Sequence, residues 1–192
     1  MNSHIYRFSR AKGAARNQGK GFTLIELLVV LVIVGILFAI AAPSWVSFLN
    51  RQRLSTARGQ VFEISRSAQA EAKRTKVNRA VFFDNKDGKP RAIVVPYKDD
   101  ASTPTDDNGG WQVLGNGDIN AGVIKIAGKL GTATETASGK IGFDTYGNLD
   151  QKIVTAPYTI TIQTANAPSR RCVKITTLLG AMTSAEDGDC HK

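Results

Sequence analysis

The dominant feature of the hydropathy pattern is one long apolar run near the amino terminus. From Phe22 to Ala42 the sequence carries a single charge, Glu26. A helix rises about 1.5 Å per residue, so a run of about 20 residues spans roughly 30 Å, the hydrocarbon thickness of a bilayer. The pattern therefore predicts a helix that can cross a membrane.

Helical periodicity continues beyond this run. Pro43 follows it and predicts a kink rather than an end, because the pattern after it remains helical. Apolar residues then recur at intervals of three and four, which places them on one face of a helix. We therefore expect one long helix over residues 22–78, with residues 22–42 in the membrane and an amphipathic second half. The apolar stripe of that second half consists of Leu54, Ala57, Val61, Ile64, Ala68 and Ala72.

From Arg79 onward the helical pattern gives way to short apolar and β-branched runs separated by turn-rich pieces. The segment 99–110, with four aspartates and no large apolar residue, predicts an exposed loop. The predicted fold class is α+β, a long amino-terminal helix packed on an antiparallel β-sheet head over residues 79–192. Its strands are expected at residues 80–83, 92–97, 112–114, 123–126, 140–143, 158–163 and 172–177.

The formal net charge of +9 is spread unevenly along the chain. The excess of basic residues lies in residues 1–21 and 44–79, so residues 80–192 are close to neutral. This distribution removes the main reason to expect a head that binds nucleic acid. Lys and Arg beside a membrane helix are held on the cytoplasmic side. The basic residues before Phe22 thus predict a cytoplasmic amino end and a head on the outer side, although the charge of residues 44–79 acts against this placement.

The two cysteines, Cys172 and Cys190, both lie near the carboxyl end. Their spacing has none of the CxxC character of a metal or redox site. One disulfide formed in an oxidising compartment fits this pattern, and two unrelated free thiols are the alternative. The disulfide would tie the carboxyl-terminal tail to the last strand.

The junction before the apolar run consists of Gly21, an aromatic residue, and a glutamate five residues after the glycine. It resembles the junction of type IV prepilins and type II secretion pseudopilins. The resemblance implies that residues 1–21 are a leader, that prepilin peptidase cleaves between Gly21 and Phe22, and that Phe22 is then N-methylated. It also implies that Glu26 pairs with the Phe22 amine of a neighbouring subunit. The alternative is a glutamate at the headgroup boundary without a partner.

The carboxyl-terminal third is similar to the GspH/FimT family of minor pilins and pseudopilins. The similarity rests on a Phe-x-x-x-Gly turn from Phe143 to Gly147, the alternating segment 158–163, the segment 170–175, and Gly180. Family members that bind DNA carry a basic Gly-Arg-x-Arg tail, whereas here Gly180 is followed by a small polar segment and then acidic residues. Arg170 and Arg171, expected beside Tyr158, remain the candidate DNA contacts.

Nothing in the sequence predicts catalysis, a metal or a cofactor. His4 lies in the leader and His191 is next to last, so no histidine within the fold is available as a base or ligand. The aspartates of 99–107 lack the spacing of a calcium loop, and Gly115 and Gly117 form a turn rather than a phosphate loop.

The sequence therefore predicts a non-enzymatic minor pilin or pseudopilin subunit. Glu26 and Pro43 are its expected assembly residues, and a type IV pilus or a type II secretion pseudopilus is the expected product. The alternative is a DNA-binding minor pilin that acts in natural transformation. Expected partners are prepilin peptidase, other pilin or pseudopilin subunits, inner-membrane assembly machinery and the lipid bilayer, with DNA added in the alternative. The expected location is the inner membrane, crossed once, with a periplasmic head.

Overall fold

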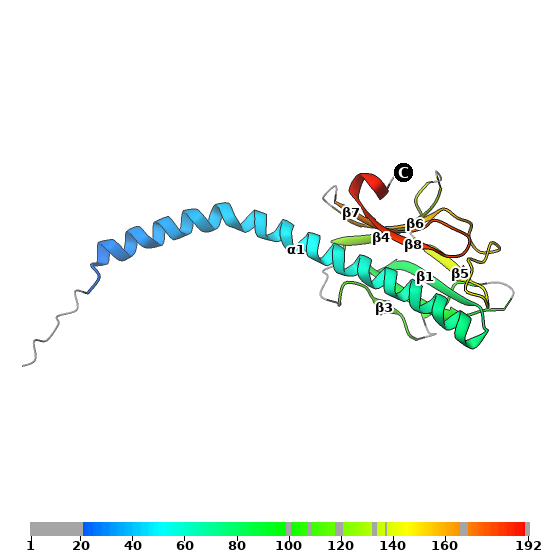
Figure 1. The fold of residues 1–192 in the computed structure, drawn as a ribbon. Helices are drawn as coiled ribbons and strands as arrows, with labels where there is room; N and C mark the ends of the chain where they lie inside the picture. The colour runs from blue at the N-terminus through cyan, green and yellow to red at the C-terminus, as the bar shows by residue number, and fades with distance from the viewer. Residues whose placement is uncertain are drawn as a thin grey trace, which may run out of the picture. The chain divides into compact units, whose positions relative to one another are not determined.

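A computed structural model describes residues 21–98, 101–106, 109–117, 121–131, 134–136, 138–165 and 169–190 (Figure 1). The predicted leader, apart from Gly21, lies outside these residues, as do His4 and His191. The chain divides between Pro43 and Ser44 into two units. Each unit is described below by itself.

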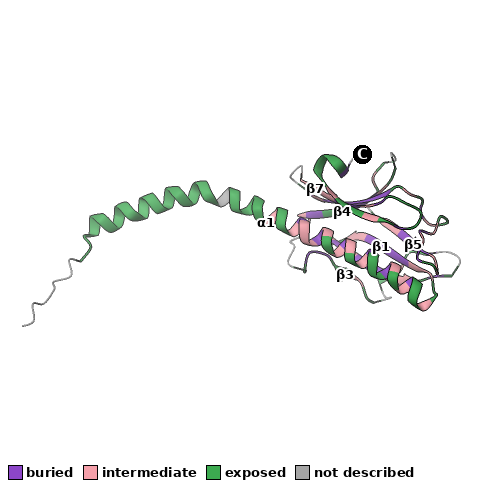
Figure 2. Ribbon diagram, in the orientation of Figure 1, coloured by how far each residue is buried: buried purple, intermediate pink, exposed green. Residues whose placement is uncertain are grey.

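Helix α1 runs over Leu24–Thr75, and it confirms the predicted long helix. In its second half the predicted apolar stripe is buried except at Ile64, which is partly buried; Leu54, Ala57, Val61 and Ala72 are fully inaccessible. Figure 2 shows this stripe as buried positions recurring along the part of α1 that packs on the head. The helix ends where Lys76 turns into the left-handed region at φ 56°, while its N–H still bonds to the carbonyl of Ala72.

The first sheet of the head has the order β3-β2-β1-β5 and is antiparallel throughout. Asp87 and Gly88 form the β1–β2 turn with φ of 51° and 73°, the conformation that matches the twist of a two-residue hairpin. Asn85, Lys86, Lys89 and Pro90 on either side of this turn belong to the strands. The strands are β1 (Arg79–Lys86), β2 (Lys89–Pro96), β3 (Gln112–Val113) and β5 (Gly139–Phe143).

The second sheet has the order β4-β6-β7-β8 and is also antiparallel. The predicted sheet head is thus two four-stranded sheets. Strand β8 was not predicted, and β7 is not the last strand as expected, because the chain turns back after Gly180 and ends in the short 3-10 helix η2 (Asp187–Cys190). The strands are β4 (Ile124–Leu130), β6 (Tyr158–Thr164), β7 (Arg170–Ile175) and β8 (Met182–Glu186).

The main core lies between the stripe of α1 and the inner faces of both sheets. A second, smaller cluster lies on the other face of β1 and β2, and it includes Ala101 at 2% exposure. The prediction of a wholly exposed 99–110 loop is therefore wrong at Ala101. Asp106 in the same loop is held by ion pairs with Lys86 and Arg91, which keep the pKa of its carboxyl below the usual value. The largest fully buried core side chains include Leu54, Phe83, Leu114, Ile126, Phe143 and Ile160.

Side chains join the two sheets at the edge of β4. The amide of Asn85 donates to the carbonyl of Ile126 at 2.7 Å and accepts from the N–H of the same residue at 2.9 Å. It thereby satisfies the backbone of an edge strand that would otherwise be open to pairing. The hydroxyl of Tyr158 fits between Gly128 and Gly139, where a Cβ on either glycine would collide with it.

Candidate functional site

The amino-terminal segment has an ordered local geometry at the start of α1. Gly21 and Phe22 precede the helix and are exposed. The hydroxyl of Thr23 accepts a hydrogen bond of 3.3 Å from the N–H of Glu26, three residues on. Thr23 therefore caps the helix, and the Thr-x-x-Glu spacing is that of a capping box. This spacing is visible in the sequence, so the cap is predictable from it.

Glu26 lies in the first turn of α1 and is exposed. A carboxylate at a helix amino terminus is favoured by the unsatisfied N–H groups there. Among the described residues Glu26 forms no ion pair, so its charge is available to a group outside this chain. The Gly21–Phe22 peptide bond lies outside the helix.

The first half of α1 presents apolar side chains all round. From Leu24 to Ala41 every residue is exposed, with Leu24 at 82% and Phe38 at 71%. The mean hydropathy of its most apolar window is 3.1, and the helix is long and apolar enough to cross a membrane. A surface of this kind is stable only in lipid or against other apolar helices.

The candidate DNA contacts are arranged differently from the prediction. In the β6–β7 pairing, Tyr158 lies opposite Ile175, whereas Arg170 and Arg171 lie opposite Gln163 and Ile162 at the other end of the hairpin. Tyr158 is also buried. The expectation that these arginines stand beside Tyr158 is therefore wrong, since the residues opposite them lie four and five positions from Tyr158 along β6.

Both arginines also have carboxylate partners. The Arg170 guanidinium is paired with Glu135 at 3.5 Å, and the backbone N–H of Arg170 donates to Asp187 at 2.8 Å. Arg171 is paired with Glu186, and the same carboxylate binds Arg58 of α1 at 3.0 Å. Glu135 thus pairs with Arg170, while Glu186 of β8 pairs with Arg171 and ties β8 to α1.

The cysteines form the disulfide Cys172–Cys190, with the two Cα atoms 5.8 Å apart. Cys172 lies in β7 and Cys190 ends η2, and both are buried. The bond holds the tail that follows β8 against β7. The sequence predicted this pairing of cysteines. It also predicted that the strand carrying Cys172 would be the last one, which is wrong because β8 follows β7.

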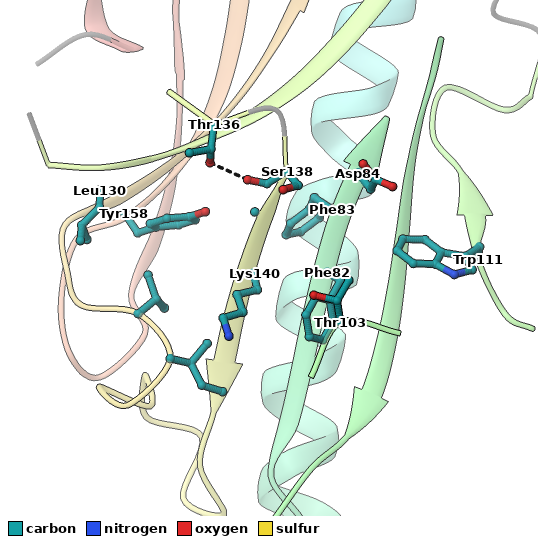
Figure 3. Close-up of a pocket in the computed structure, with 13 residues that line it drawn as sticks. Phe82, Phe83, Asp84, Thr103, Trp111, Leu130, Thr136, Ser138, Lys140 and Tyr158 are labelled. Carbon is teal, nitrogen blue, oxygen red and sulfur yellow. Dashed lines mark hydrogen bonds between the residues drawn. The ribbon is translucent and has the colours of Figure 1, made fainter. Parts of the chain in front are cut away.

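A cavity of about 480 Å³ opens near the start of β5 (Figure 3). Two of its charged side chains already have partners within the chain, and its tyrosine is buried. Asp84 accepts from Arg91 at 3.0 Å, the Lys140 ammonium donates to the carbonyl of Ala101 at 3.3 Å, and burial raises the pKa of Tyr158 to about 12. The described residues contain no cluster that could hold a metal ion. The walls include Phe82, Phe83, Trp111, Leu130, Ile153 and Val154.

Comparison with known proteins finds a known motif in the amino-terminal segment and several similar proteins. Residues 16–42 match the model of the prokaryotic N-terminal methylation motif. The chain is 38% identical over 71 residues to a fimbrial protein of Moraxella nonliquefaciens, covering 37% of this chain and 44% of that protein. It is 31% identical over 119 residues to the fimbrial protein EcpC of Eikenella corrodens, covering 61% of each. The chain is similar to type IV fimbrial proteins. It spans less than two thirds of the length of these curated relatives.

Two solved structures are similar to this chain at low sequence identity. The type IV minor pilin FimU of Pseudomonas aeruginosa has a TM-score of 0.49 at 17% identity, and the match covers 72% of this chain and 92% of FimU. The minor pseudopilin EpsH of Vibrio cholerae has a TM-score of 0.43 at 12% identity, with 71% and 98% covered.

Proposed function

We propose that this chain is a non-enzymatic minor pilin or pseudopilin subunit. In this proposal, prepilin peptidase removes residues 1–21, Phe22 is N-methylated, and α1 then joins the helices of other subunits in a type IV pilus or a type II secretion pseudopilus. The observation that carries the proposal is the exposed first half of α1, which is apolar except for Glu26 and lies within the match to the methylation motif.

The proposed location is the inner membrane, crossed once by α1, with the head in the periplasm. The basic residues before Phe22 support a cytoplasmic amino end. The disulfide supports an oxidising compartment for the head. The subunit would wait there until the inner-membrane assembly machinery transfers it into the fibre.

In this proposal Glu26 gives the membrane helix its role in assembly. Cleavage would create an amine on Phe22, four positions before a carboxylate that has no ion pair among the described residues. In an apolar helix bundle, an amine or a carboxylate left without its partner costs several kcal/mol. A neighbour's amine paired with Glu26 would therefore fix the axial register of each incoming subunit.

The ion pairs of Arg170 and Arg171 favour assembly over DNA binding as the function. A phosphate could reach either guanidinium only by competing with Glu135 or Glu186. The contribution of these two residues to a DNA surface is accordingly small.

The test replaces Glu26 by Leu in the full chain and measures the protein in sheared fibres relative to the membrane fraction. If Glu26 pairs with a neighbour, the variant should be cleaved and inserted normally but should drop out of the fibre. Glu63→Leu is the matched control, because Glu63 is an exposed glutamate in the second half of α1. Equal recovery of Glu26→Leu and wild type in the fibre would refute the assembly role of Glu26.

A further inference from the structure

Two turns of the head meet beside the carboxyl-terminal end of α1 and display an apolar patch. Gln69 of α1 donates to the carbonyl of Gly147 in one turn at 2.7 Å and to that of Leu179 in the other at 3.1 Å. The side chains beside these bonds point to solvent, with Tyr146 at 71%, Leu178 at 46% and Leu179 at 73% exposure. We call Tyr146, Leu178 and Leu179 the distal patch.

The turns that carry the distal patch are held in one conformation. The Asp144 carboxylate accepts from the N–H groups of Tyr146 and Asn148, each at 2.8 Å. Gly147 and Gly180 have φ of 77° and 76°, and a Cβ on Gly180 would lie 2.5 Å from the Gln69 amide. An apolar surface fixed in this way loses little conformational entropy when a partner covers it.

Cationic side chains line one side of the distal patch. The Lys76 ammonium lies 5.3 Å from the centre of the Tyr146 ring and donates to the carbonyl of Thr145 at 3.4 Å. The aliphatic part of Lys73 packs against Gly147, and Arg74 between these lysines is exposed. A complementary surface would be apolar at its centre and acidic at its rim.

The size of the distal patch limits what can bind it. Three side chains are few against the roughly 800 Å² per partner, or 20–30 residues a side, of a stable protein interface. A contact this small becomes effective when the partner is already held nearby, because a tether raises its local concentration. A subunit anchored by the same kind of amino-terminal helix meets that condition.

A second copy of this chain is a poor match. At the other end of the head, where α1 enters the second unit, Arg51 is exposed and Arg53 is half-buried. Within the described part of the chain, neither arginine has an ion pair. Stacking two copies end to end would bring these cations toward Lys73 and Lys76.

We propose that the distal patch is the docking surface for a different pilin-like subunit, one whose facing surface is apolar with carboxylates around it. This inference rests on the proposed function. The chain would then enter a fibre at a position set by an unlike neighbour and would not polymerise with itself.

The test uses the full chain in its native membrane and a carbodiimide that couples amines to carboxylates in direct contact. We expect Lys73 or Lys76 to be linked to an Asp or Glu of another chain that carries a prepilin-type motif, as mass spectrometry of the linked peptides would show. Lys73→Arg with Lys76→Arg keeps the charge but lacks the reactive amines, so it should lose this link and keep assembly. Links to a second copy, or no link from either lysine, would overturn the proposal.

Leu179→Asp should lower both the link and the recovery of the protein in the fibre about tenfold, as loss of a central contact does. Val113→Asp, at an exposed apolar position on β3, is the control and should change neither. Tyr146→Ser serves as a second variant if Leu179→Asp is not stably inserted. If wild type is recovered in the fibre and both patch variants are recovered there in the same amount, the inference is wrong. If wild type itself is missing from every fibre, the proposed function is wrong.

Discussion

Removing the Cys172–Cys190 disulfide should weaken the head by an amount that its loop length predicts. The two cysteines are 18 positions apart. In the chain-entropy model, closing a loop of that size stabilises the folded state by about 3 kcal/mol. The total free energy of unfolding of a domain is about 5–15 kcal/mol, so this one bond is a large share of it.

Alanine is the better replacement at both positions. Cys172 is inaccessible and Cys190 is 3% exposed, so a serine hydroxyl there would add the penalty of a buried unsatisfied group. The variant Cys172→Ala with Cys190→Ala should still fold, because β8 remains paired with β7 and Glu186 still binds Arg58.

The assay is denaturant and thermal unfolding of the full chain in detergent, followed by the fluorescence of Trp111 in a Trp45→Phe background. A loss of about 3 kcal/mol corresponds to a fall in Tm of roughly 6–12 °C for a domain of this size. Wild type under reducing conditions should have the same free energy of unfolding and the same Tm as the alanine variant. An unfolding free energy within about 1 kcal/mol of oxidised wild type would refute the reasoning, since it is far below the loop-closure value.

Two further predictions concern the turns and a buried phenol. Gly180→Ala should destabilise the head by about 1–3 kcal/mol because Gly180 has a positive φ and lies close to the Gln69 amide. Gly59→Ala, at an open helical position, should instead stabilise the head by about 0.5–1 kcal/mol. Unfolding in denaturant measures both changes in free energy. Burial raises the pKa of Tyr158 to about 12. Its contribution to stability is therefore complete below pH about 10 and lost as pH rises toward 12. Ultraviolet titration should show one late-ionising tyrosine fewer in Tyr158→Phe.

The helix and most strands could be predicted because each has a periodic pattern that burial requires. The stripe of α1 repeats at three and four positions, and the segment around Ile160 alternates. Strand β8 could not be found this way. Its residues from Met182 to Glu186 are mostly exposed and hardly alternate, and pairing with β7 and the ion pairs of Glu186 hold it in place.

Contacts between distant parts of the chain account for the other differences. The way the two sheets pack together includes the Asn85 amide at the edge of β4 and the fit of Tyr158 between two glycines. Neither contact has a local signature. The separation of Tyr158 from Arg170 likewise follows from strand register, which the length of the connecting turn sets. The Thr23 cap, in contrast, is indicated by the sequence itself, through the Thr-x-x-Glu spacing of Thr23 and Glu26.

The most direct test of the central claim is the intact mass of the full-length protein recovered from its native membrane. The account predicts a mature chain that begins at Phe22 and carries one added methyl group on its amine. Gly21→Val should leave the leader attached, because the cleaved bond follows that glycine. A wild-type protein that still begins at Met1, or one cut after the apolar run at Ala42, would contradict the claim that α1 is a processed and retained assembly helix.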